Sequence, residues 1–87
     1  MKYILPFHKL QRLNLTGTKV GDFGLKYVRE LEHLIELRLD YTQITDQGLQ
    51  HLTSLSKLND LYMLHTDVTD EGVELLQQSL PKCHIRF

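Results

Sequence analysis

The chain has 87 residues, and ten Lys and Arg against eleven Asp and Glu give it a formal net charge of −1. This balance provides no basic field, so we expect neither nucleic acid nor a membrane surface as a partner. A chain of this length forms one domain, 1–87, of modest stability. Its single cysteine, Cys83, excludes an internal disulfide and a thiolate metal cluster, and we expect no cofactor.

The N-terminal segment lacks the features of a targeting sequence. The apolar run within residues 1–6 is too short for a signal peptide. No stretch of the sequence approaches the ~18 apolar residues of a membrane span. These features favour a cytoplasmic location.

Apolar and small residues recur every 24 positions along the chain, as in Leu13, Leu37 and Leu61. Further columns with this spacing are Leu10, Leu34 and Leu58; Leu15, Leu39 and Met63; Thr18, Thr42 and Thr66; and Gly24, Gly48 and Gly72. The columns define units at 10–33, 34–57 and 58–79, after a partial unit or N-terminal cap at 1–9 and before a terminal strand at 80–87. No single unit can bury its own leucines, so we expect the units to stack into one continuous core.

Each unit has a strand pattern followed by a helix pattern. Its first half alternates apolar and polar residues, which is typical of a strand with one buried face. Its second half spaces apolar residues three to four positions apart, which indicates a short helix. In chain order we expect a helical stub within 1–9, then strands at 11–16, 35–40, 59–64 and 82–86, with helices at 22–32, 46–55 and 70–79 between them.

Threonine–aspartate pairs precede the second and third helices. In these pairs, whose threonines are Thr45 and Thr69, a hydroxyl or a carboxylate can cap the free amide groups of the following helix. Gly21 takes the place of the threonine before the first helix and weakens that cap. Gly48 and Gly72 are costly inside a helix, so we interpret them as points where a helix approaches its neighbour closely.

The unit reads Leu-x-x-Leu-x-Leu-x-x-Thr-x-(Ile/Val)-x-Asp-x-Gly-(Leu/Val)-x-x-(Leu/Val). It resembles the leucine-rich-repeat family over residues 10–76, and in particular its 24-residue bacterial-type repeat with Thr-x-Ile-Thr-Asp-x-Gly-Leu. The resemblance implies an α/β fold, a right-handed solenoid shaped as a short horseshoe, with about four parallel strands on the concave face and short helices on the convex face. Threonine stands where the best-known repeats carry asparagine or cysteine. We therefore expect Thr42 and Thr66 to bury their hydroxyls against a backbone amide of the loop.

Both ends of the chain continue the pattern. Residues 1–9 match the tail of an earlier unit, and the segment 80–85 matches the strand motif 22 residues after Leu58. Its Leu-Pro-x-Cys-x-Ile order resembles the final strand of this repeat class. We interpret the chain as the C-terminal part of a longer array, and the open first strand with its apolar stub predicts a homodimer through the N-terminal end.

The resemblance implies that a partner docks on the concave strand face, and strand alternation tells which side chains point outward there. The protein-binding candidates are Arg12, Asn14, Glu36, Arg38, Asp40, Asp60, Tyr62, Leu64, His84 and Arg86. Neighbouring parallel strands lie ~4.8 Å apart, which would set Arg12 beside Glu36 and Asp60 beside Lys82. Such pairs are either solvated ion pairs or docking contacts.

Tyr41, His65 and Phe87 follow the strands in what we interpret as the loop column. If exposed beside Tyr62 and Leu64, they would form an aromatic cluster of the kind found at interface hot spots. The alternative for Tyr41 and Phe87 is that both tuck inward as packing.

The histidines and the cysteine form no catalytic or metal-binding pattern, so we do not expect an enzyme. Five histidines lie on helices or strands without an acidic column that would complete a metal site or a catalytic triad. Cys83 and His84 are adjacent on a strand and point to opposite faces, with the thiol in the core. The sequence also contains no glycine-rich phosphate loop.

These observations favour a protein–protein interaction module that binds a partner of unknown identity on the concave face. One alternative is a structural C-terminal segment of a longer repeat protein, with no binding site of its own. Another is the substrate-recognition arm of a ubiquitin-ligase adaptor. Adaptors with similar repeats usually have longer units, cysteine in the threonine column and an added adaptor-binding motif, and the sequence shows none of these.

Overall fold

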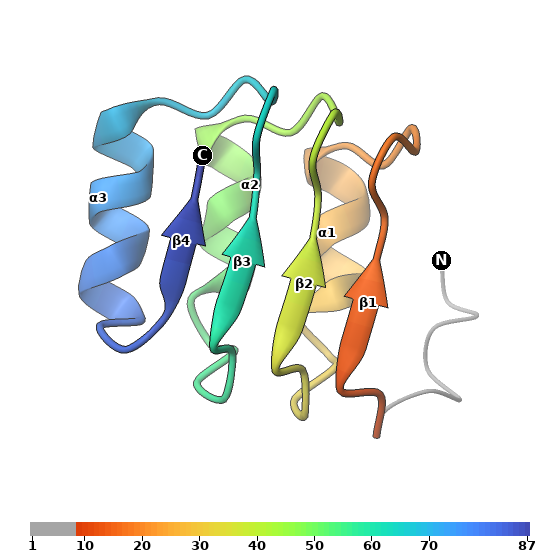
Figure 1. Ribbon diagram of the computed structural model, residues 1–87, viewed down its shortest axis with the longest axis vertical. Coiled ribbons are helices and arrows are strands. Elements are labelled where there is room, and N and C mark those ends of the chain that lie inside the picture. The colour runs from red at the N-terminus through yellow and green to blue at the C-terminus, as the bar shows by residue number, and fades with distance from the viewer. Residues whose placement is uncertain (1–8) are drawn as a thin grey trace.

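A computed structural model describes residues 9–87. Four strands form one parallel sheet in the order β1-β2-β3-β4. They are β1 (Arg12–Asn14), β2 (Glu36–Arg38), β3 (Asp60–Tyr62) and β4 (His84–Arg86). The connections contain α1 (Asp22–Val28), α2 (Asp46–Leu49) with the 3₁₀ turn η2 (Gln50–Leu52), and α3 (Asp70–Ser79). All three helices lie on one side of the sheet (Figure 1), which confirms the expected α/β solenoid architecture.

The hydrophobic core lies between the sheet and the helices. The middle strands contribute Leu37, Leu39, Leu61 and Met63, all fully buried, and Cys83 is buried just before β4. The helices and turns add Leu25, Val28, Leu31, Leu49, Leu52, Leu55, Val73 and Leu76.

Three side chains expected in the core are only half-buried. Leu13 lies in β1, Leu15 directly follows it and Ile85 lies in β4, and each packs against the edge of the core. Within residues 9–87, the first and the last strand each have a neighbouring strand on one side only, so their inward side chains are covered less than those of the middle strands. The expectation of full burial was therefore wrong at these three positions.

The last strand keeps the 24-residue spacing of the other strands. In the register of β3 and β4, Leu61 pairs with Ile85 and Asp60 with His84. The 22-residue match to the segment 80–85 was therefore wrong, and Lys82 lies before the strand rather than beside Asp60.

The threonine column closes the turn after each strand. The hydroxyls of Thr18, Thr42 and Thr66 each donate to the carbonyl three residues earlier, at 2.7, 2.7 and 2.8 Å. The partner of the hydroxyl is a carbonyl that accepts, and not the expected amide that would donate to it, because loop amides such as that of Tyr41 donate to the next unit, here to the Leu64 carbonyl. Of the two hydroxyl groups expected to be buried, Thr42 is buried and Thr66 only half-buried.

Threonine caps begin two of the helices, as expected. The hydroxyl of Thr45 accepts from the Gln47 amide at 3.3 Å, and that of Thr69 accepts from the Gly72 amide at 3.2 Å. Gly21, which begins α1, provides no side-chain cap.

The aspartates of the repeat bond to the next unit rather than to their own helix. The carboxylate of Asp22 accepts from the Thr45 amide and hydroxyl at 2.7 and 2.5 Å. Asp46 accepts from the amide and hydroxyl of Thr69 at 2.8 and 2.5 Å. Of the two capping groups that the sequence left open, the threonine hydroxyl is therefore the one that caps, whereas the Asp22 and Asp46 carboxylates link successive turns of the solenoid.

The two helical glycines make room for these carboxylates. A Cβ on Gly48 would overlap the carboxylate of Asp22, and a Cβ on Gly72 would overlap that of Asp46. This confirms the close approach expected at both glycines and identifies the group that approaches.

Some expectations fall on residues 1–8. The helical stub, the apolar N-terminal cap and the homodimer contact built on them lie outside the described residues.

Candidate protein-binding face

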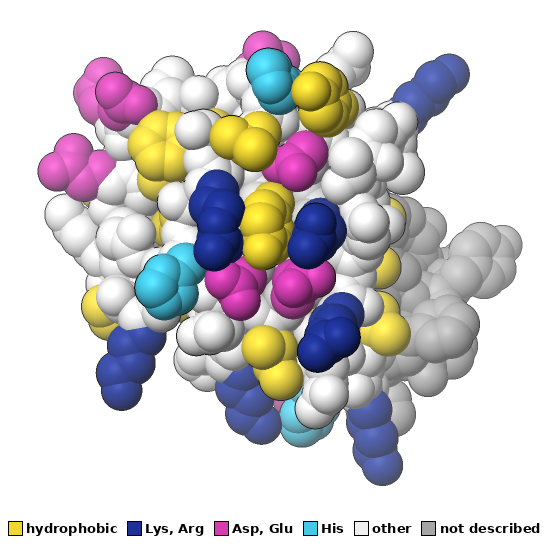
Figure 2. All heavy atoms as spheres, in the orientation of Figure 1, with side chains coloured by type: hydrophobic (Ala, Val, Ile, Leu, Met, Phe, Trp, Pro, Cys, Tyr) yellow, Lys and Arg dark blue, Asp and Glu magenta, His cyan; other side chains and the backbone are white. Residues whose placement is uncertain are grey.

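The strand face consists of the side chains that point from β1–β4, and the loops just after them, away from the helices. None of the ten residues expected there is fully buried. Figure 2 looks onto this face and shows basic, acidic and hydrophobic side chains interleaved over the middle of the sheet. The strands therefore present a surface of mixed charge and polarity.

Tyr62 lies at the centre of this surface, between two arginines. In the sheet register Arg38 and Arg86 flank it from the neighbouring strands. Their guanidinium carbons lie 4.3 and 4.6 Å from the centre of the ring. A cation over each side of one tyrosine stabilises both arginines by cation–π attraction, at about 0.5–1 kcal/mol per exposed contact.

Two carboxylates hold these arginines in place. Arg38 Nε donates to Glu36 Oε2 at 3.1 Å, and Arg86 Nη1 donates to Asp60 Oδ1 at 3.1 Å. The hydrogen bond with Glu36 raises the pKa of Arg38, so this guanidinium stays charged at any physiological pH. We call these five residues the arginine–tyrosine cluster.

The ion pairs differ from those expected between neighbouring strands. Arg12 is opposite Glu36 in the register, yet Glu36 bonds to Arg38 on its own strand. Asp60 pairs with Arg86 and not with Lys82, because the register of β4 differs by two residues from the 22-residue match expected from the sequence. The two strand-face ion pairs of the described residues therefore both belong to the arginine–tyrosine cluster.

A second group lies where β2 and β3 run into their loops. The rings of Tyr41 and His65 stack with centroids 4.5 Å apart and planes inclined by 15°. Tyr41 is 63% exposed and neighbouring Leu64 is 41% exposed. We call Tyr41, Leu64 and His65 the loop edge. Of the two alternatives left open for Tyr41, exposure and inward packing, the structure shows exposure.

The backbone at the loop edge is in the left-handed region. Tyr41 has φ 58° and His65 has φ 59°, in the column where Gly17 has φ 72°. Glycine adopts this conformation freely, whereas bulky side chains rarely do. The turn geometry is thus fixed by the repeat, and Tyr41 and His65 adopt it at a cost in conformational free energy.

Other candidates have structural bonds as well. Asp40 Oδ1 accepts from the Leu64 amide at 2.7 Å, and Asn14 Oδ1 accepts from the Thr16 amide at 3.0 Å. Arg12 and His84 are exposed on the two outer strands. Asn14 and Asp40 therefore shape the turns, which leaves the arginine–tyrosine cluster and the loop edge as the main groups available to a partner.

Phe87 does not belong to the loop edge. The register places Arg86 opposite Tyr62, so Phe87 continues the column of Met63 and not that of Tyr41. Its side chain is half exposed at the C-terminal side of the core. The interpretation of Phe87 as a loop-column residue was wrong for the same reason as that of Lys82.

The cysteine and the histidine that follows it differ in exposure. Cys83 is buried while His84 is exposed, and burial raises the pKa of the Cys83 thiol to about 11, which keeps it protonated at neutral pH. Among residues 9–87, no three His, Cys, Asp or Glu side chains are placed to hold a metal ion. In the same part of the chain, no helix has the length and apolar character needed to cross a membrane.

Comparisons with known proteins agree with this repeat architecture. The family described as "Leucine Rich repeat" matches residues 8–28 and 30–52, which together make up just over half of the chain. The chain belongs to the leucine-rich-repeat family. The family supports a generic repeat module for protein interaction, and its members are typically non-enzymatic scaffolds.

A solved leucine-rich-repeat protein from Leptospira interrogans has the same fold. It superposes with a TM-score of 0.55 at 22% sequence identity, over 90% of this chain. The chain spans only 25% of the length of that protein. No curated protein matches the chain significantly.

The binding residues predicted from the sequence include Leu64 but neither of the other two residues of the loop edge. Tyr41 and His65 were predicted as loop-column residues, with exposure left open for Tyr41, and their mutual stacking was not expected. The 24-residue spacing between them carries the signal, because equivalent positions of adjacent leucine-rich repeats lie side by side. Applied to loop positions as well as to strands, the same spacing would have predicted the ring pair.

Proposed function

We propose that this leucine-rich-repeat chain is a protein-interaction module whose docking site is the arginine–tyrosine cluster together with the loop edge. The observation that carries the proposal is the Arg38–Tyr62–Arg86 stack. Tyrosine and arginine are the residue types most enriched at binding hot spots, and here they meet at the centre of the strand face.

The order within the cluster supports a role in recognition. Each arginine is held by a ring and a carboxylate, so little side-chain entropy is left to lose when a partner binds. Arg38 bonds to Glu36 through Nε only, and its two terminal nitrogens have no partner among the described residues. These N–H groups are suited to carbonyl or carboxylate oxygens of a partner.

The loop edge adds an apolar contact beside these polar groups. Leu64 follows Tyr62 by two positions on the same face, and the Tyr41–His65 stack lies next to it. A partner segment with an apolar side chain next to backbone or carboxylate acceptors would meet both groups. The partner in this proposal is therefore a protein segment rather than a small molecule.

The test is to select peptides from a displayed random library on the immobilised chain and to measure their Kd by fluorescence anisotropy. We expect Tyr62→Ala to weaken the selected peptides by about 30-fold or more, the loss typical of a hot-spot residue. Tyr62→Phe keeps the ring between the arginines, so it should retain most of the affinity.

A control lies outside the strand face. Glu32 is exposed in the turn after α1, and Glu32→Ala should leave the Kd unchanged. Circular dichroism verifies that each variant is folded. Peptides that bind Tyr62→Ala as tightly as the native chain would contradict the proposal, and a library that yields no ligand would favour a structural segment without a binding site.

A further inference from the structure

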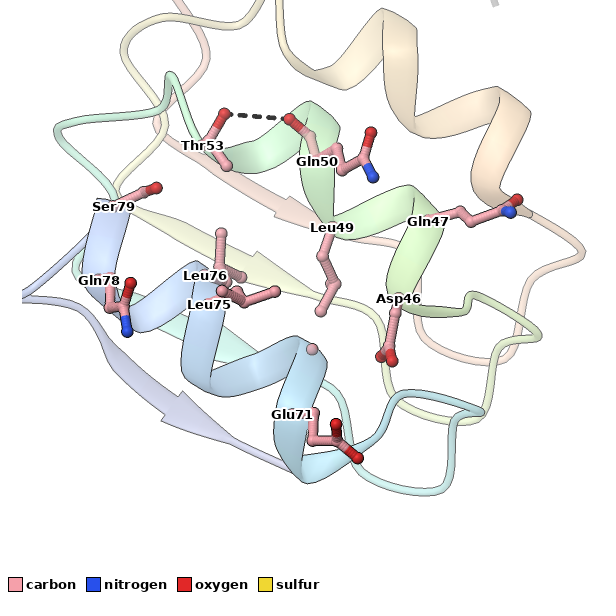
Figure 3. Close-up of a pocket in the computed structure, with 11 residues that line it drawn as sticks. Asp46, Gln47, Leu49, Gln50, Thr53, Glu71, Leu75, Leu76, Gln78 and Ser79 are labelled. Carbon is pink, nitrogen blue, oxygen red and sulfur yellow. Dashed lines mark hydrogen bonds between the residues drawn. The ribbon is translucent and has the colours of Figure 1, made fainter.

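The helix side of the molecule contains a groove between α2 and α3, with a volume of about 500 Å³. Leu49, Leu75 and Leu76 converge between the two helices and form its apolar part (Figure 3). Leu49 and Leu76 are buried, whereas Leu75 is 67% exposed. Exposed apolar surface in a concave site is suited to receive an apolar side chain.

The charges around the groove are all negative. Asp46 and Glu71 lie at the end where both helices begin (Figure 3), and Glu74 lines an adjoining hollow with Leu75. The other polar lining residues are uncharged, and α2, η2 and α3 contain neither lysine nor arginine. The two bonds from Thr69 lower the pKa of Asp46, so its carboxylate stays ionised. An apolar side chain next to a positive charge is therefore the complementary occupant.

A group with these properties protrudes from α1. Phe23 is 71% exposed and meets Tyr27 edge to face, with centroids 6.3 Å apart. Lys26 Nζ lies 4.4 Å from the centre of the Phe23 ring and 5.4 Å from that of Tyr27. We call Phe23, Lys26 and Tyr27 the aromatic knob, since two rings carry one ammonium group.

The exposure of Phe23 does not arise from α1 being the first helix described. Gln47 and Glu71 occupy the same column at 24-residue intervals, and both are exposed although each has a helix on its N-terminal side. This column therefore points away from the core in every unit. An aromatic residue there remains exposed unless another molecule covers it.

We propose that the groove receives the aromatic knob of a second copy of this chain. In this arrangement Phe23 packs against Leu75 of the other copy, and Lys26 lies near Glu71 and Glu74. The contact uses neither the strand face nor the N-terminal end expected from the sequence.

The arrangement of the helices allows a closed dimer. α1 contacts α2 and α2 contacts α3, so the knob and the groove flank α2 on the helix side. A two-fold axis along α2 would set each knob opposite the groove of the other copy, which makes two identical contacts. These contacts involve fewer residues than the 20–30 per partner of a stable dimer, so we expect weak association, with a Kd on the order of 10–100 µM.

Sedimentation equilibrium from about 10 µM to about 1 mM tests this proposal, because the range spans the expected Kd. The native chain should shift from monomer to dimer. Lys26→Glu, and separately the double variant Glu71→Lys/Glu74→Lys, should weaken association by about ten-fold or more through like-charge repulsion at both contacts. An equimolar mixture of the two variants should dimerise again, since every contact then joins opposite charges.

Two controls separate this contact from other interactions. Lys57→Glu makes the same change of charge at an exposed position outside the knob and should not alter the dimer. Tyr62→Ala, on the strand face, should also leave it unchanged, so the proposed function and this contact can fail independently. A chain that stays monomeric, a dimer insensitive to the charge reversals, or swapped variants that do not associate when mixed would overturn the proposal.

Discussion

The middle and the first units of the solenoid have the same repeat but different surroundings. Leu37 in β2 is fully buried between two neighbouring strands, whereas the equivalent Leu13 in β1 is half-buried. Thr45 caps α2 and also bonds to Asp22, whereas Gly21 gives α1 no side-chain cap. The comparison teaches that a repeat residue stabilises the fold mainly through its neighbours in adjacent units.

The largest expected effect is in the core. Leu37→Ala should lower the free energy of unfolding by about 2–5 kcal/mol, because it leaves a cavity in a region packed on all sides. Leu13→Ala removes a half-buried side chain and should cost about 1–2 kcal/mol. Urea denaturation followed by circular dichroism measures both. Equal losses at the two positions would mean that the first unit is as well packed as the middle one.

The helical glycines provide the next test. Gly72→Ala places a methyl group against the Asp46 carboxylate and disturbs its bonds to Thr69, so we expect a loss of about 1–3 kcal/mol. Gly21→Ala is the matched control, since a Cβ there would meet nothing within 4 Å and the backbone is extended. Urea denaturation should show a smaller loss for the control, where Ala is only a poorer N-cap than Gly, and a harmless Gly72→Ala would contradict the close approach.

The threonine column gives an intermediate effect. Thr42→Val keeps the shape of the side chain but removes the donor to the buried Leu39 carbonyl, which should cost about 1–3 kcal/mol. Thr66→Val should cost less, because Thr66 is only half-buried and water can replace its hydroxyl. Thermal unfolding of the two variants side by side would reveal the difference, and a larger loss at Thr66 would refute it.

The smallest expected change stabilises the protein. Gly21→Thr would give α1 the cap that Thr45 and Thr69 give the other helices, and we expect a gain of a few tenths of a kcal/mol. Gly17→Thr is the contrasting control, because φ 72° makes threonine strained there although the space is equally open. The two melting temperatures should move in opposite directions. A fall for Gly21→Thr would show that an absent cap does not explain the difference between the units.

Much of the fold could be predicted because the repeat is local and periodic. Strand alternation set Leu37 and Leu39 inward and Arg38 outward, and the structure agrees. The prediction failed at the last strand, where a 22-residue match between leucines and Cys83 competed with the 24-residue spacing. Backbone hydrogen bonding decides the register, and it follows the spacing of the other strands.

The candidate site was predicted only in outline. Alternation identified which side chains face outward, but ion-pair partners depend on side-chain reach, and Glu36 proved closer to Arg38 than to Arg12. The bonds from Asp22 to Thr45 were missed for a related reason. Local capping rules consider one helix at a time, whereas in a stacked repeat the nearest amide to a carboxylate belongs to the next unit.

The left-handed backbone at Tyr41 and His65 has a consequence for the energetics of binding. Such residues have few alternative conformations within the turn, and stacking restricts their rings further. The conformational entropy of this edge is therefore largely lost during folding rather than during association. A protein that binds there would meet rings that are already ordered, and calorimetry should show a smaller unfavourable entropy than for a variant with glycine at both positions.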